Sequence, residues 1–114
     1  MANFMFVYRG GDDSEHSPEE MQQIMQVWTD WIQGGMQAGW MLDGGDALKP
    51  GGRVVNPDQT VTDGPFAESK ELVGGFSMIQ ADSFDAAAEI AKSCPMIAAG
   101  GTVEVRELLG FGKD

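Results

Sequence analysis

The segment with the densest set of reactive side chains runs from Asp63 to Glu71 and reads Asp-Gly-Pro-Phe-Ala-Glu-Ser-Lys-Glu. Gly64 and Pro65 impose an irregular backbone, because proline fixes its own φ and restricts the residue before it. In such a loop Asp63 could act as a general base or hydrogen-bond anchor, and Lys70 could hold an anionic group or pair with a carboxylate. A turn aspartate that bonds nearby amides, followed by a solvated charge run, explains the same residues.

Glu20 is a second candidate for acid–base chemistry. Ser17 can cap the first amides of a helix, Pro18 suits the first helical position, and Glu20 completes a capping box. Capping alone would explain Glu20. If its carboxylate instead faces the same cavity as Asp63, the pair would raise the pKa of one member and suit proton transfer. Two carboxylates alone are too few ligands for a metal ion, so we expect no metal site.

The chain has one cysteine and one histidine. Cys94 precedes Pro95 at the end of a predicted helix, where the helix dipole disfavours a thiolate. We therefore predict a buried structural thiol rather than a nucleophile. One cysteine cannot form an intrachain disulfide, and no Cys/His cluster suggests zinc. His16 lies just ahead of a helix start and is predicted to be a solvated flanking residue.

The elements that must position these side chains follow the order β, α, several β, α, β. Residues 3–9 alternate with apolar side chains on both faces, which predicts a central strand covered on both sides. A long helix is predicted to begin at Pro18 and to end at Gly39, and a second is predicted to begin after Ser83 and to stop at Pro95. The first helix carries an apolar stripe at i, i+3, i+4 and i+7 spacing, which is predicted to be core. The stripe consists of Met21, Ile24, Met25, Trp28, Trp31 and Ile32.

Between and after the helices the sequence predicts strands and turns. The predicted strands are residues 40–48, 53–56, 59–62, 72–80 and 102–108. Gly44-Gly45 interrupts the first of these, which indicates a bulge or a close backbone approach. The two short strands form an extra hairpin around a turn. Two helices and these strands predict an α+β fold with both helices on one face of a mostly antiparallel sheet. Glu104 and Arg106 share one face of the last strand and are predicted to form an ion pair or a dimer contact.

Two helices can cover only one face of that sheet. The other face carries apolar groups from the first strand and from Phe76 or Met78. A bare apolar sheet face of this size is normally buried against a partner. We therefore predict a homodimer packed sheet to sheet.

Length and composition limit the functions that the chain could have. A chain of 114 residues is predicted to form a single domain, residues 1–114, because domains cluster near ~100–150 residues. Its net charge of −11 argues against nucleic acid and against an anionic membrane surface, since both need clustered Lys and Arg. There is no long apolar span or basic leader, so a cytoplasmic location is expected. Sixteen glycines are present, yet none of their pairs forms a nucleotide-binding fingerprint, and we expect no cofactor.

Residues 61–71 resemble the signature of the YCII-related proteins, specifically their DGPF branch. The resemblance continues at residues 72–76 and 101–106, and with the landmarks near Pro18 and Pro95 it extends over nearly the whole chain. It implies a ferredoxin-like βαββαβ unit, here with an extra hairpin, that pairs into a dimeric α+β barrel. This barrel is similar in fold to muconolactone isomerases and to small monooxygenases that handle heme or quinones.

The resemblance implies divided functions. Some members look like enzymes, including a dehydrochlorinase-like branch, and others occur beside or fused to extracytoplasmic-function sigma factors. The enzyme-like members carry a histidine early in the first helix and an aspartate just before the proline that ends the second. The landmarks Pro18 and Pro95 put Glu20 and Cys94 at these two places, so the His–Asp mechanism does not carry over.

Two functional hypotheses follow. The first is a small-molecule-binding protein, able to act as a cofactor-independent acid–base enzyme of the lyase, isomerase or hydrolase type. Its cavity would lie near the loop of residues 63–66, with Asp63 and Glu20 as candidate catalytic residues and Phe66, Glu68 and Lys70 as candidate ligand contacts. The alternative is a non-catalytic regulatory or interaction module, associated with a sigma factor. The sequence leaves both open.

Overall fold

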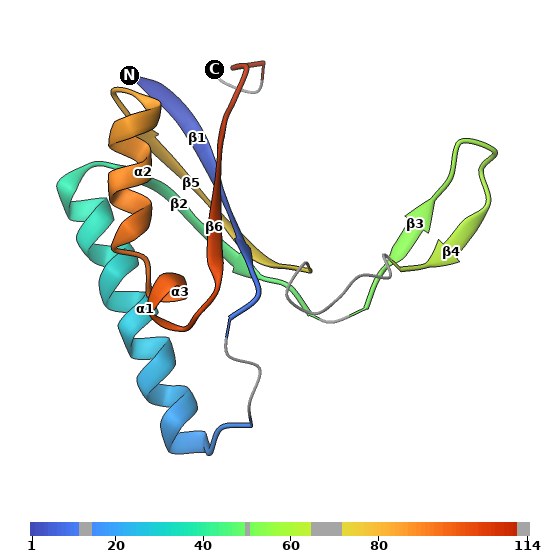
Figure 1. The fold of residues 1–114 in the computed structure, drawn as a ribbon, viewed down its shortest axis with the longest axis horizontal. Coiled ribbons are helices and arrows are strands. Elements are labelled where there is room, and N and C mark those ends of the chain that lie inside the picture. Colours follow the sequence, from blue (N-terminus) through green and yellow to red (C-terminus); the bar gives the residue numbers. More distant parts are fainter. Residues whose placement is uncertain (12–14, 50, 65–71, 112–114) are drawn as a thin grey trace.

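The computed structural model describes residues 1–11, 15–49, 51–64 and 72–111 (Figure 1). The elements, in chain order, are β1 (Ala2–Arg9), α1 (Pro18–Ala38), β2 (Met41–Ala47), β3 (Arg53–Val55), β4 (Val61–Asp63), β5 (Val73–Ala81), α2 (Phe84–Lys92), α3 (Pro95–Ala98) and β6 (Thr102–Glu107).

Four strands form the main sheet in the order β2-β5-β1-β6. Every neighbouring pair is antiparallel. This is the ferredoxin-like arrangement, in which β5 lies between the two strands of a split β-α-β unit, β1 and β2. The predicted α+β fold with an antiparallel sheet is therefore confirmed.

The predicted extra hairpin is also present. β3 and β4 pair only with each other among the described strands, with Val54 opposite Thr62. The carbonyl of Asn56 accepts a hydrogen bond from the amide of Gln59, at 2.8 Å, which closes the turn between them. Figure 1 shows this hairpin standing away from the four-stranded sheet.

α1 begins and ends where local chemistry predicts. The Ser17 hydroxyl accepts from the Glu20 amide and the Glu20 carboxylate accepts from the Ser17 amide, so the capping box is formed. At the other end, Gly39 has a φ of +91°, which glycine adopts without strain, and its amide donates to the carbonyls of Gly35 and Met36.

The core lies on one face of the sheet. Alternate residues of β1 and β5 are buried there and meet two alanines of α2, Ala87 and Ala91. The buried residues of β1 and β5 are Phe4, Phe6, Tyr8, Gly75, Ser77, Ile79 and Ala81, and Met41 of β2 is buried as well. The helices pack on this face, as predicted.

The opposite face, here called the open face, carries apolar side chains that are only half-buried. Met5 lies opposite Met78, and Val7 lies opposite Phe76. Both faces of β1 are thus apolar, as the sequence predicted, but the helices contact only one of them.

Two expectations are wrong. Pro95 does not simply stop a helix, because α2 ends at Lys92 and Pro95 begins the short helix α3. Proline is well suited to a first helical position, where its missing amide is not needed. The apolar stripe of α1 is also not all core: Met21 and Met25 are 45% and 61% exposed. Met25 borders a groove, which is described below.

Candidate functional site

A groove with a volume of about 810 Å³ lies between α1, the ends of β2 and β5, and the segment around α3. Part of the α1 stripe forms one wall, namely Ile24, Met25, Trp28 and Ile32. Met96 of α3 lies in the same lining. This part of the stripe therefore borders a hollow, which is why Met25 stays exposed.

Aromatic rings mark the inner end of the groove. The ring of Trp28 meets the ring of Tyr8 edge-on, with centroids 5.1 Å apart, and meets Trp31 at 6.0 Å. Trp31 in turn packs on Trp40 and donates its indole N–H to the Ser93 hydroxyl, at 2.9 Å. This network fixes Trp28 between the core and the groove.

Backbone forms much of the opposite wall, through three pairs of glycines: Gly10, Gly11, Gly44, Gly45, Gly74 and Gly75. Gly45 has a φ of +70°, and a Cβ there would collide with the carbonyl of Phe76. A Cβ on Gly75 would lie 2.8 Å from the carbonyl oxygen of Asp46. The register between β2 and β5 shifts at this point, so the predicted bulge with close backbone approach is confirmed.

A buried series of hydrogen bonds supports the glycine-lined wall of the groove. The Tyr8 hydroxyl donates to Ser77 Oγ at 2.8 Å, and Ser77 Oγ donates to the carbonyl of Gly44 at 2.8 Å. The thiol of Cys94 interacts with the same Tyr8 hydroxyl. Tyr8 lines the groove, so this series joins the groove to the core.

Burial determines the protonation states of Tyr8 and Cys94. Desolvation raises the pKa of Tyr8 above its usual value and raises the pKa of Cys94 to about 11. Both groups are therefore neutral near pH 7. Cys94 is only 2% exposed, so the predicted burial of the thiol is confirmed, and its structural role stays a prediction.

Polar side chains at the groove include His16, Glu20, Gln23 and Asp46. The predicted capping role of Glu20 is confirmed, because its Oε1 accepts from the Ser17 amide at 2.8 Å. Glu20 also lines the groove. His16 is half-buried in the lining rather than a fully solvated flank. Its position just before the N-cap was the available signal, since that position commonly packs back on the helix.

Asp46 was not singled out from the sequence. It follows the Gly44-Gly45 bulge, and its Oδ1 accepts from the Ala47 amide at 2.8 Å. The glycine pair indicated that another group can approach the backbone closely here. That group can be a neighbouring strand or a ligand.

Asp63 lies elsewhere. It ends β4 in the hairpin, where its carboxylate pairs with the Arg53 guanidinium at 3.0 Å, and both side chains are about 70% exposed: 73% for Asp63 and 69% for Arg53. Asp63 is not part of the groove lining, so the structure does not bring it together with Glu20. Phe66, Glu68 and Lys70 lie outside the described residues.

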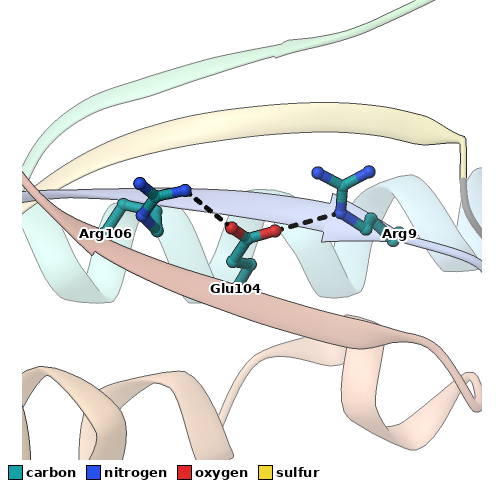
Figure 2. Close-up of polar contacts among 3 residues, drawn as sticks. All are labelled: Arg9, Glu104 and Arg106. Atoms are coloured by element: carbon teal, nitrogen blue, oxygen red, sulfur yellow. Dashed lines mark hydrogen bonds and ion pairs between the residues drawn. The ribbon is translucent and has the colours of Figure 1, made fainter.

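A charged cluster lies on the open face at its β1–β6 side (Figure 2). Glu104 accepts from Arg106 at 3.0 Å and from Arg9 at 3.1 Å. The hydrogen bond from Arg106, followed by that from Arg9, lowers the pKa of the Glu104 carboxyl. The predicted ion pair of Glu104 with Arg106 is confirmed, and Arg9 joins it through strand pairing that the sequence did not show.

Two kinds of site are absent from the described residues. No three His, Cys, Asp or Glu side chains among those residues gather closely enough to hold a metal ion. None of the helices in the described part of the chain has the length and apolarity needed to cross a membrane.

Comparison with known proteins places the chain in a family. One solved structure that it resembles is 5-chloro-2-hydroxyhydroquinone dehydrochlorinase from Burkholderia phenoliruptrix AC1100, in complex with 2,5-dihydroxybenzoquinone. The two are 16% identical over 92% of each chain, with a TM-score of 0.39. None of the curated proteins matches this chain. The family model of the YCII-related domain matches residues 3–112, and the chain therefore belongs to the YCII-related family.

Proposed function

We propose that the groove between α1 and the sheet binds a small organic molecule with an apolar body. Its volume of about 810 Å³ falls in the range of ligand pockets, roughly 300–1,000 Å³. The observation that carries the proposal is the exposed half of the α1 stripe. Met25 is 61% exposed although it belongs to the apolar face, and a bound apolar molecule would cover it.

The lining also offers proton donors and acceptors. Glu20 is the candidate proton carrier, with His16 in the same lining as a second titratable group. Asp63 has no part in this proposal, because it pairs with Arg53 in the hairpin. Cofactor-independent proton transfer is the chemistry that these side chains support.

The groove proposal is tested with N-phenyl-1-naphthylamine, an uncharged probe whose fluorescence rises in apolar surroundings. We expect saturable binding and at least a tenfold loss of affinity in Met25→Asp. Met36→Asp is the matched control, because Met36 is 49% exposed on the same helix but does not line the groove. Absence of saturable binding, or equal losses in both variants, would contradict the proposal and favour the alternative of a regulatory module.

We propose in addition that two copies pair through their open faces. Met5, Val7, Phe76 and Met78 form a half-buried apolar patch there, and the Arg9–Glu104–Arg106 cluster lies beside it. A half-buried apolar patch on a sheet face is a common place for a second protein chain to pack. Sedimentation should show a dimer that Met78→Asp converts to monomer and Met36→Asp does not. A wild-type monomer at micromolar concentration would overturn this proposal.

A further inference from the structure

The charges of the groove lining are one-sided. Glu20 and Asp46 are its acidic residues, and none of the described lining residues is Lys or Arg. His16 is the remaining titratable base there. An apolar hollow whose charged side chains are carboxylates favours a positively charged ligand over a negatively charged one.

Basic side chains of the described residues are mostly engaged elsewhere. Arg9 and Arg106 hold Glu104 on the open face, Arg53 pairs with Asp63 in the hairpin, and Lys92 pairs with Glu89 at 2.6 Å on α2. The acidic partners in these pairs are Glu104, Asp63 and Glu89, none of which lines the groove, and the chain as a whole carries a net charge of −11.

The two carboxylates enter the groove from different elements. Glu20 comes from the first turn of α1, and Asp46 comes from β2 just after its bulge. Each accepts one local backbone hydrogen bond, at 2.8 Å, from Ser17 and Ala47 respectively. A carboxylate has about four lone-pair sites, so it can accept from more than one donor at a time.

Other residues of the groove lining suit a cation with an apolar body. Trp28 presents an aromatic ring in the lining, and a cation over such a ring is attracted to its negative face. Met25 and Met96 add polarizable thioethers that adapt to ligand shape.

One feature of the groove acts in the opposite sense, because the N-terminal end of a helix attracts anions. In α1 a side-chain cap and two acidic residues already lie at this end. Ser17 Oγ accepts from the Glu20 amide at 3.1 Å, and Glu19 and Glu20 place two negative charges in the first turn.

We propose that the groove selects organic cations, namely an apolar or aromatic body that bears a protonated amine, over neutral and anionic molecules of the same shape. This inference rests on the proposed binding function and names its ligand class.

Three probes of matched shape test it: 2-(1-naphthyl)ethylamine, 2-(1-naphthyl)ethanol and 1-naphthaleneacetate. Affinities are measured by calorimetry at low and high salt. We expect the amine to bind at least tenfold more tightly than the acetate, with the alcohol between them, and the preference to shrink in 0.5 M salt.

The two carboxylates are tested by Glu20→Gln and Asp46→Asn. Glutamine still completes a capping box and asparagine can still accept from Ala47, so both folds should survive. Each change should weaken amine binding about fivefold, the effect of one charge near 4 Å in water, and leave alcohol binding unchanged. Glu19→Gln and Asp43→Asn are the controls, since neither residue lines the groove.

The outcomes separate the two proposals. If the alcohol binds as tightly as the amine, or the control variants weaken the amine equally, the cation preference is wrong and the groove proposal stands. If none of the three probes binds, both proposals fail.

Discussion

The two long helices on the covered face of the sheet pack in different ways. α2 has nine residues and buries Ala87 and Ala91, which are 0% and 7% exposed. α1 has 21 residues, yet Gly35 is its one buried residue. The longer helix, with the bulkier apolar side chains, is the less buried of the two.

Side-chain size explains the difference. Alanines let α2 lie directly on the strands, and Gly35 does the same for the C-terminal half of α1, where a Cβ would lie 2.7 Å from the Trp40 ring. In the N-terminal half, Trp28 and Met25 stand between helix and sheet without filling the space. The groove is thus a consequence of where large and small residues lie along α1.

The largest effect on stability should come from placing a large side chain in α2 where the small Ala87 now lies against the strands. Ala87→Leu adds three carbons to a fully buried site and should lower the free energy of unfolding by about 3 kcal/mol. Ala38→Leu makes the same change in α1 at an exposed position and should change the free energy of unfolding by less than about 0.5 kcal/mol. Urea unfolding measures both, and similar losses would contradict the packing difference.

The comparison also shows what sequence could predict. The bounds of α1 followed from Ser17, Glu20 and Gly39, because capping is a local property. The α+β order and the extra hairpin followed from periodicity and turn residues. Apolar periodicity identified the stripe of α1, but it specifies which face is apolar and not what covers it.

The candidate site was harder to predict because it depends on contacts between distant elements. Glu20 was placed correctly from a local motif. His16 and Asp46 reach the groove only through the packing of α1 over the β2 bulge. Asp63 appeared important within its motif, but pairing of β3 with β4 carries it into a hairpin beside Arg53.

A second effect should appear at high pH in the packed region just after α2. The folded-state pKa of Cys94 is raised from 9.0 to about 11, so the folded state holds this proton more tightly than the unfolded state does. Its contribution is fully present below pH 9 and is lost as the pH rises through 11, by roughly 2 kcal/mol. Cys94→Ala should flatten the fall in stability over that range, as alkaline unfolding would measure. An unchanged pH slope would show that the thiol is not desolvated.

A third, smaller effect concerns the wall of the groove, which depends on hydrogen bonds more than on packing. Ser77→Ala leaves the Tyr8 hydroxyl and the Gly44 carbonyl without their buried partner, and should cost about 1.5 kcal/mol. Amide exchange at residues 44–47 should rise. Tyr8→Phe is the control, because it keeps the bond from Ser77 to Gly44 and should leave exchange at the bulge near its wild-type rate. Equal exchange in the two variants would argue against the support of the bulge by Ser77.

The smallest effect should separate the N-caps of the two helices. Ser83 Oγ accepts from the Ala86 amide at 3.1 Å and Ser17 Oγ from the Glu20 amide at 3.1 Å, so the lost bond is the same in Ser83→Ala and Ser17→Ala. α2 is short and its first turns lie against the core, so fraying there exposes Ala87 and should cost the whole protein about 1 kcal/mol. The first turn of α1 is exposed, so its fraying exposes little new apolar surface and should cost less than about 0.5 kcal/mol globally. Amide exchange in that turn should nevertheless rise several-fold. A larger global loss in Ser17→Ala than in Ser83→Ala would mean that the N-terminal half of α1 is more firmly packed than its exposure indicates.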